Sequence, residues 1–586
     1  MRIAIDTETA LASEEQPIPA LVSVAIASSD ETLLFHQKDP ELFGVLSAIF
    51  GSHHAVFAFA PFDVFVLWRW RPEIWPTIKR AYDEGRIVDI LTNQRMIDTA
   101  TGEQRPKDEG VSLAVLAHRW LDLDLAKGED TWRLRYAELS DVPIDQWPSD
   151  AREYALKDAR VTWDVDAKQA IHLPYLVDGP HQAQASLCLY RQTLIGVETD
   201  PERVRALDLE FLHRIRDEQQ ACLDTGMARW ARKDGRLQIV KNQKIAREMM
   251  FDISGQTSIA QEELDAAKIP EGHPLKHYQR LGSIKTQHSK NVLVLRHPRI
   301  RTSYVSPVDS GRVSSRNPGD PWVGTNLQNL PRDGGVRGCL RAPPDHSFIV
   351  SDYGALELVT LAQIQLDWFG RSALADMLRE GRDPHAEFAM QIFGGGGTYD
   401  PKNPEHKRAR QGAKAWNFGK PGAMGQAKFI AWAWNTYQYE VTPKRERELT
   451  ALWKRLFPEI EMYWARIRTM ERLPGLYNIV HVRSGRHRSK IRFPEAANSF
   501  FQGLGSDVSK RSLWRLFEAS LDPTSLLYRC PQVLTVHDEH VTVCPDDRAA
   551  EALHEQERIM IAAAAEYCPD VPIKVESALA KNYCKP

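Results

Sequence analysis

The chain has 586 residues, of which 43% are hydrophobic and 26% charged, and its formal net charge at pH 7 is −3. This composition excludes a disordered chain, and one hydrophobic core rarely exceeds about 300 residues, so we expect two or more domains. No segment approaches the ~20 uncharged apolar residues of a membrane-spanning helix, which excludes a spanning protein. The seven cysteines are scattered without a C-x-x-C pair, which argues against a disulfide framework and is typical of the reducing cytoplasm.

Residues 1–170 alternate short apolar runs with helical patterns, which predicts an α/β domain. Arg2–Thr7 and Ala20–Ala27 are predicted strands, and Val111–Trp120 is a predicted amphipathic helix. Proline and glycine break the pattern within 172–180, so we place a domain boundary at about residue 178. The residues from there to about 300 are mostly helical and polar.

A first group of carboxylates is distributed over this domain. The first predicted strand contains Asp6 and Glu8, which alternation places on one side, and Asp63 follows an apolar stretch. Tyr154 and Asp158 are four residues apart in a helical pattern and therefore share a face. Converging carboxylates repel one another unless divalent cations lie between them. Two Mg²⁺ ions about 3.5–4 Å apart are the known arrangement for phosphodiester hydrolysis.

The order Asp-x-Glu, Phe-Asp and Tyr-x-x-x-Asp resembles the proofreading 3′→5′ exonucleases that carry a tyrosine in their last motif. The second motif of that family usually has an asparagine four residues before its aspartate, where this chain has Phe59, which affects a substrate contact. The resemblance implies a ribonuclease H-like domain with two Mg²⁺ ions. It also implies four metal ligands, Asp6, Glu8, Asp63 and Asp158, and a tyrosine that orients the attacking water, Tyr154.

A second group of carboxylates lies in the last 250 residues. The run Ser347–Ser351 is typical of a buried strand and leads into Asp352, and Gln532–Val543 is typical of a β-hairpin with Asp538 at its turn. One sheet can bring the two aspartates together, where they could hold two metal ions against a triphosphate. Either piece alone is more typical of an exposed acidic turn.

Between these pieces, Arg410, Lys414 and Phe418 follow at intervals of four, so one helical face presents two cations and an aromatic ring. Such a face suits a triphosphate and a flat base or sugar, although a helix with two surface cations and a core phenylalanine has the same pattern. Pro421 is expected to end this helix. Two stretches without acidic residues, 272–308 and 406–439, indicate surfaces for a polyanion.

Together these segments resemble motifs A, B and C of the family A DNA polymerases, the DNA polymerase I type, over most of the last 400 residues. Ser310-Gly-Arg312 resembles the segment that grips primer–template, and Asp383-Pro-His385 resembles an Asp-x-His whose histidine approaches the triphosphate. Thr325–Pro331 resembles the Asn-Leu-Gln-Asn-Ile-Pro signature of the family. Asn498 and Gln502, four apart, resemble the helix that reads the minor groove near the primer end.

The resemblance implies a role for each matching residue. Asp352 and Asp538 would bind two Mg²⁺ ions, which Mn²⁺ can replace, with Glu539 assisting. Glu357 would be the steric gate against a ribose 2′-hydroxyl. The implied contacts to the nucleotide and to DNA are Arg410, Lys414, Phe418, His385, Tyr353, His537, Arg312, Gln328, Asn498 and Gln502.

Two departures from the family pattern narrow the interpretation. The tyrosine four residues after the motif B phenylalanine, which stacks at the template position, is replaced by Gly422. The run Asn-Phe-Gly-x-Pro-Gly that contains it resembles phage branches of the family. The exonuclease motifs begin at Asp6, so we expect no 5′-nuclease domain of the bacterial type.

We therefore expect a multidomain α/β and α+β protein: an exonuclease domain over 1–178 and a right-hand polymerase domain over 179–586. The predicted thumb is about 200–302, the fingers about 365–490, and the palm the remainder. The expected function is template-directed DNA polymerisation with proofreading in a phage-infected host cytoplasm, with primer–template DNA, dNTPs and phage or host replication proteins as partners. The alternatives are a single-subunit RNA polymerase, a non-catalytic DNA-binding relic, and an exonuclease whose polymerase half has decayed.

Overall fold

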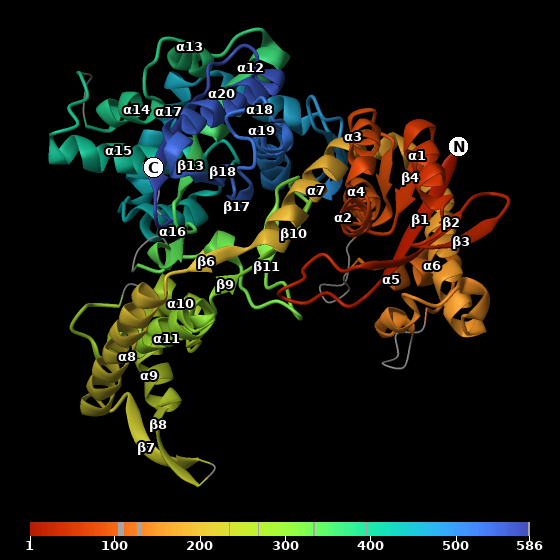
Figure 1. The fold of residues 1–586 in the computed structure, drawn as a ribbon. Coiled ribbons are helices and arrows are strands. Elements are labelled where there is room, and N and C mark those ends of the chain that lie inside the picture. The colour runs from red at the N-terminus through yellow and green to blue at the C-terminus, as the bar shows by residue number, and fades with distance from the viewer. Residues whose placement is uncertain are drawn as a thin grey trace.

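A computed structural model describes residues 1–103, 111–125, 132–233, 235–267, 269–331, 335–393 and 397–583. Figure 1 shows an N-terminal α/β domain on one side, a helix-rich body around an antiparallel sheet on the other, and a long arm extending away from both. Among the described residues, no helix is both long and apolar enough to span a membrane.

The N-terminal domain is built on a five-stranded sheet of order β3-β2-β1-β4-β5, in which β1 pairs antiparallel with β2 and parallel with β4. Alternation along β1 buries Ile3 and Ile5 in one core cluster and Ala4 in another, on opposite faces of the sheet. The elements are β1 Arg2–Thr9, β2 Leu21–Ala27, β3 Thr32–His36, α1 Leu42–Ser52, β4 His54–Phe57, α2 Ala60–Trp70, α3 Trp75–Asp83, β5 Ile87–Asp89, α4 Ile90–Thr101, α5 Leu113–Leu121 and α6 Ser149–Gln169. The predicted strands and the helix at Val111–Trp120 are confirmed to within two residues.

Helix α7 (Gly179–Ile195) begins next to the predicted boundary and is shared by the two halves of the molecule. It packs against α2 and β5 of the N-terminal domain and also against the long helix α19 (Phe493–Leu521) and the strand β17 (Gln532–Val536). Its buried face includes Leu187, which lies in the same core cluster as Trp514 of α19. A movement of α7 would therefore change packing contacts in both halves.

The arm seen at the bottom of Figure 1 follows α7 in the chain, and its residues include most of the predicted thumb. Its own small core joins its helices through Met227, Met250 and Leu281. A short sheet, β12-β6-β9, joins its base to the body. The elements of the arm and of the segments between it and the rest of the molecule are β6 Val197–Thr199, α8 Pro201–Asp224, β7 Ala228–Lys233, β8 Arg236–Lys241, α9 Gln243–Ser254, α10 Gln261–Ala266, α11 Pro274–Gln287, β9 Arg299–Ile300, β10 Ser303–Val305, β11 Ser314–Arg316 and β12 Leu340–Arg341.

The body is organised around an antiparallel sheet of order β17-β18-β13-β19. Strand β13 is central, and its residues alternate between two cores: Ile349 packs with α12 and α19, while Phe348 and Val350 pack with β17 and β18. The elements are β13 His346–Gly354, α12 Leu356–Phe369, β17 Gln532–Val536, β18 Glu539–Pro545, α20 Ala549–Tyr567 and β19 Lys574–Ala580, with α19 as given above.

The predicted fingers form a group of helices that pack on this body through buried Trp416 and Trp453. A three-stranded sheet, β14-β15-β16, follows them and contacts α4 of the N-terminal domain. Helix α15 ends at Gly419, two residues before Pro421, as predicted. The elements are α13 Ala373–Arg379, α14 Pro384–Phe393, α15 Pro404–Gly419, α16 Gln426–Tyr437, α17 Pro443–Leu456, α18 Glu459–Arg468, β14 Glu471–Leu473, β15 Leu476–Val480 and β16 His487–Ile491.

Two candidate active sites

The antiparallel register of the body sheet brings the second acidic group together. Asp352, near the end of β13, lies directly opposite Glu539, the first residue of β18. Asp538 lies in the two-residue turn before β18, where His537 adopts a left-handed conformation with φ of 60°. Loss of surrounding water and the nearby Asp352 carboxylate raise the pKa of Asp538 to about 7. The sheet therefore brings the two aspartates within electrostatic reach of each other.

Glu539 is held by a residue that the sequence analysis did not identify. The hydroxyl of Tyr583 donates to Glu539 Oε1, and Arg337 Nη1 lies 3.3 Å from the same hydroxyl oxygen. Glu539 is only 2% exposed. Tyr583 follows the last strand and lies 44 residues from Glu539 in the sequence, so no local spacing could have indicated this contact.

Glu357 lies in the first turn of α12, just after the left-handed residue Ala355. Arg312 Nη2 donates to Glu357 Oε1. Burial raises the pKa of Glu357, an effect that the Arg312 guanidinium partly offsets. Both residues act electrostatically on Asp538, so this ion pair borders the aspartate pair.

The Tyr353 side chain, a predicted nucleotide contact, packs into the body on the other side of β13. Because side chains alternate along a strand, Tyr353 and Asp352 face opposite sides of β13. The Tyr353 hydroxyl lies 2.6 Å from the Met560 carbonyl oxygen and 2.6 Å from Ser512 Oγ, and the side chain is buried. The Asp538 charge still helps to raise the pKa of Tyr353, so its buried hydroxyl remains within electrostatic reach of that carboxylate.

Helix α15 presents Arg410, Lys414 and Phe418 as partly exposed residues among largely buried neighbours, which confirms that they share a face. Arg410 forms an ion pair of 2.7 Å with Asp383, and the Phe418 ring centroid lies 5.1 Å from that of His385. Burial lowers the pKa of His385 to about 4, and the charges of Arg410 and Lys414 act in the same direction. His385 is thus a neutral imidazole beside two cations at neutral pH.

Asn417 fixes the position of His385 and was also missed from the sequence. Its amide nitrogen lies 2.9 Å from His385 Nδ1, and its oxygen accepts a 2.8 Å hydrogen bond from the indole of Trp453. Asn417 is next to Phe418 on α15, so its presence in motif B was visible. The sequence did not show that its amide would contact His385 on α14.

The turn after α15 lies against the start of α19. A Cβ atom added at Gly422 would lie 2.2 Å from Asn498 Oδ1, and the carbonyl of Pro421 accepts a 3.0 Å hydrogen bond from Trp464. The amide of Asn498 therefore occupies the space beside Gly422. Gln502 follows one turn later on α19 and is partly exposed.

Gln328 packs against β17, because its side-chain amide lies 3.3 Å from the Thr535 carbonyl oxygen. It is 6% exposed. His537, two residues after Thr535, is exposed at the hairpin turn. Gln328 is thus close to the hairpin that carries Asp538, with its own side chain already engaged.

The first acidic group forms a second site, in the N-terminal domain. Asp6, Glu8 and Asp158 offer carboxylate oxygens that all lie within 4.8 Å of one another. Asp6 and Glu8 extend from the face of β1 that α6 covers, and α6 carries Asp158. Burial and the neighbouring carboxylates raise the pKa of Asp6 and of Glu8 well above their ordinary values. This concentration of negative charge is typical of a cation site.

Asp63 contributes charge to this site but lies outside the group of three. Its Oδ1 accepts hydrogen bonds from the Thr7 backbone N–H, at 3.0 Å, and from Thr7 Oγ1, at 2.7 Å. Burial raises the pKa of Asp63 to about 7 despite these hydrogen bonds. Tyr154 hydrogen-bonds to Asp158, whose pKa burial raises to about 6. Phe59 packs edge-on against Tyr190 at 5.3 Å.

The residues present fit a hard divalent cation. Glu8 Oε1 is buried and has no hydrogen-bond partner among the described residues, and an uncompensated buried carboxylate oxygen is costly. All the converging ligands are carboxylate oxygens, which Mg²⁺ and Mn²⁺ prefer.

The comparisons with known proteins agree with the geometry of the body. Residues 240–585 match the sequence model of DNA polymerase family A. The chain belongs to this family. It is 28% identical over 278 residues to DNA polymerase I of Aquifex aeolicus, and the aligned region covers 47% of this chain and 44% of that protein. It is also 28% identical over 351 residues to the thermostable DNA polymerase I of Thermus filiformis, covering 56% of this chain and 38% of that protein.

This family A chain spans about half the length of the curated relatives it matches, or less. Its fold is similar to a solved structure titled as the POL domain of Pol1 from M. smegmatis in complex with DNA primer-template and dNTP. The TM-score is 0.70 and the identity 18%, and the match covers 99% of this chain and 95% of that one. The likeness in fold therefore extends over nearly the whole chain.

Proposed function

We propose that this family A chain is a template-directed DNA polymerase that adds deoxynucleotides to a primer 3′ end. The observation that carries the proposal is the convergence of Asp352 and Asp538 at one edge of the body sheet. Family membership supports it independently. Glu357, held by Arg312 beside the two aspartates, would be the gate that excludes a ribose 2′-hydroxyl.

Divalent metal ions are used by this family in general, and we propose two Mg²⁺ ions bound by Asp352 and Asp538, with Mn²⁺ as a substitute. When bound, such ions activate the primer hydroxyl and neutralise charge on the transferred phosphoryl group. Glu539, held by Tyr583, would contribute negative charge behind them.

The nucleotide-binding face would be formed by α15 and α14. Arg410 and Lys414 would hold the triphosphate, where preorganised cations stabilise developing charge. Because Nδ1 of neutral His385 accepts from the Asn417 amide, its proton lies on Nε2, which would donate a hydrogen bond there without adding charge. Phe418 would pack against the base or sugar. Asp383, now paired with Arg410, would have to share that guanidinium with the triphosphate.

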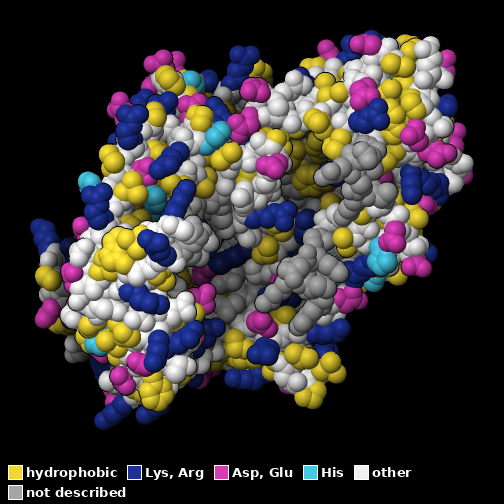
Figure 2. Space-filling view, turned by 90° about the horizontal axis from the view of Figure 1, so that it is seen from below, with side chains coloured by type: hydrophobic (Ala, Val, Ile, Leu, Met, Phe, Trp, Pro, Cys, Tyr) yellow, Lys and Arg dark blue, Asp and Glu magenta, His cyan; other side chains and the backbone are white. Residues whose placement is uncertain are grey.

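Primer–template DNA would bind in the hollow between the arm and the two domains. Figure 2 shows one face of the molecule hollowed between two lobes, with Lys and Arg side chains inside the hollow. In the stretch 272–308, Arg280 and Arg296 pair with Glu271 and Asp208 from outside it, so only part of its charge is available for phosphates. The proposed DNA contacts near the primer end are Arg312, Gln328, His537, Asn498 and Gln502.

We propose a second activity, 3′→5′ exonucleolytic proofreading, for the N-terminal domain. The strand order β3-β2-β1-β4-β5 agrees with a ribonuclease H-like sheet. Asp6, Glu8 and Asp158 would bind Mg²⁺, Asp63 would act from the adjoining position, and Tyr154 would orient the attacking water.

We also propose a phage-type origin and a place of action for the protein. A phage-type origin rests on the Asn-Phe-Gly-x-Pro-Gly run, which ends at Gly422 against Asn498. Action in a host cytoplasm with phage or host replication proteins follows from that origin. A single-subunit RNA polymerase and an exonuclease with a decayed polymerase half are the competing functions.

Extension of a labelled primer on a defined template, with Mg²⁺ and either dNTPs or rNTPs, tests the proposal. We expect template-directed extension with dNTPs and much slower extension with rNTPs. A preference for rNTPs would establish the RNA polymerase alternative, and digestion without any extension would establish the decayed polymerase.

A further inference from the structure

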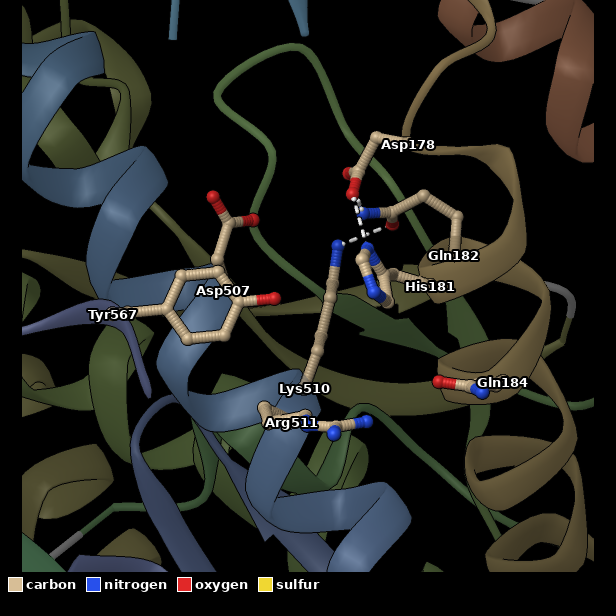
Figure 3. A pocket seen from close by; sticks show the side chains of 8 residues that line it. All are labelled: Asp178, His181, Gln182, Gln184, Asp507, Lys510, Arg511 and Tyr567. Carbon is tan, nitrogen blue, oxygen red and sulfur yellow. Dashed lines mark hydrogen bonds and ion pairs between the residues drawn. The ribbon is translucent and has the colours of Figure 1, made fainter. Parts of the chain in front are cut away.

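A network of buried charges lies where α7, α19 and the β15–β16 hairpin meet. Lys510 of α19 is 4% exposed, and Figure 3 shows its side chain extending toward Gln182 of α7. Lys510 Nζ lies 2.6 Å from Gln182 Oε1 and 2.6 Å from the Gly311 carbonyl oxygen. Burial and the neighbouring Arg486 lower the pKa of Lys510 to about 7.

Arg486, between β15 and β16, completes the network. It is 5% exposed and forms ion pairs with Asp178, at 2.6 Å, and with Asp507. Two cations and two carboxylates are thus buried within one junction. Apolar side chains of similar volume often give an equally stable interior, so stability alone does not account for a lysine here.

What the network fixes is the peptide that precedes Arg312. The Gly311 carbonyl accepts hydrogen bonds from both Lys510 Nζ and Ser506 Oγ, the latter at 2.7 Å. Gly311 has φ of 83°, and a Cβ atom there would lie 2.6 Å from Arg486 Nη2. Hydrogen bonds to its carbonyl oxygen and the Arg486 side chain against its Cα therefore fix the position of Gly311. The next residue, Arg312, donates to Glu357.

We propose that Lys510 is a positioning residue for sugar selection: it holds the Gly311–Arg312 peptide so that Arg312 keeps the Glu357 carboxylate in place over the incoming sugar. The inference rests on the proposed polymerase function and on Glu357 as the gate. The hydrogen bonds of Lys510 Nζ go to Gln182 and to the Gly311 carbonyl. Its effect must pass through the ion pair of Arg312 and Glu357.

The test compares kcat/KM for a dNTP with kcat/KM for the matching rNTP, on one primer–template, with Asp6→Ala and Glu8→Ala present throughout. We expect Lys510→Met to lower this preference for dNTP at least about fivefold, with a smaller change in overall rate. Gln182→Leu is the matched control, because it removes the other partner of Lys510, together with the 2.6 Å hydrogen bond from Gln182 to Asp178, and leaves the bond to Gly311. Its preference should stay within about twofold of the parent.

A double-mutant cycle separates positioning from general loosening of the junction. In a Glu357→Ala background, Lys510→Met should cause no further loss of preference, because the gate through which it acts is gone. An additive further loss, an unchanged preference in Lys510→Met, or an equal loss in Gln182→Leu would overturn the inference. If Lys510→Met fails to fold, Ser506→Ala removes the other donor to the same carbonyl and should lower the preference in the same direction. An unchanged preference in that variant would equally overturn it. A parent enzyme that extends no primer would refute the proposed function instead.

Discussion

The backbone of Gly422 lies so close to the side-chain amide of Asn498 that a Cβ atom on the glycine would lie 2.2 Å from Asn498 Oδ1. Gly422→Ala should therefore destabilise the fold by about 1–3 kcal/mol, the usual cost of overpacking. Denaturant unfolding measures this change.

Asn498→Ala removes the three atoms that the new Cβ would meet, so the double variant Gly422→Ala with Asn498→Ala should recover most of the lost stability. Simple addition of the two single effects would show that the contact is not the cause. Gly422→Tyr, which restores the family side chain, should be worse than Gly422→Ala unless Asn498 is shortened as well.

The two activities should separate by site. Asp6→Ala with Glu8→Ala should abolish digestion of single-stranded 3′ ends and leave primer extension nearly intact, because each carboxylate group belongs to a different domain. Glu153→Ala, on the exposed side of α6, is the control and should digest normally. A parallel fall in extension in a well-folded variant would refute the two-site account.

Metal-free stability should depend on pH through the same carboxylates. The folded-state pKa values of Asp6 and Glu8 are raised, so their contribution to stability is present below the unfolded pKa of about 4 and is lost as the pH rises through the folded values. At pH 8 in EDTA, Asp6→Asn with Glu8→Gln should therefore melt at least about 2 °C above the wild type.

Added Mg²⁺ or Mn²⁺ should stabilise the wild type and close this gap, while the variant responds little. Calorimetry or dye-monitored melting gives the melting temperature of the wild type and of the variant at pH 4 and at pH 8, each in EDTA and with added metal ion. A variant that melts below the wild type at pH 8 in EDTA would show that the carboxylates are not crowded.

Lys414→Ala should cost about 3 kcal/mol of transition-state stabilisation, roughly a hundredfold in the extension rate at saturating dNTP. Lys407, on the same helix but exposed, provides the control: Lys407→Ala should extend at nearly the wild-type rate. Equal rates for both variants would remove Lys414 from the nucleotide site.

Local patterns were enough to predict the elements that carry the carboxylates. A strand leading into Asp352, a hairpin turn at Asp538 and a four-residue spacing from Arg410 all depend on periodicity within a few residues. Alternation along β13 also accounts for Tyr353, whose side chain must face away from Asp352.

Contacts between distant segments could not be predicted in this way. Tyr583 reaches Glu539 across 44 residues, and Lys510 reaches Gln182 across 328. Asn498 could be matched to a family helix, but the close approach of Gly422 to it depends on how the turn after α15 packs on α19. In each case the signal lies in tertiary packing, which sequence spacing does not encode.

The account depends most on Asp538 as a ligand of the catalytic metal ions. Single-turnover extension with exonuclease-disabled protein, saturating dNTP and Mg²⁺ tests it, comparing the parent with Asp538→Asn and with Asp547→Asn, an exposed carboxylate beyond the far end of β18. We predict an extension rate at least about a thousandfold lower in Asp538→Asn, equivalent to about 4 kcal/mol, with DNA binding retained and Asp547→Asn unaffected. Extension by Asp538→Asn at the parent's rate, or no dNTP extension by the parent, would contradict the account.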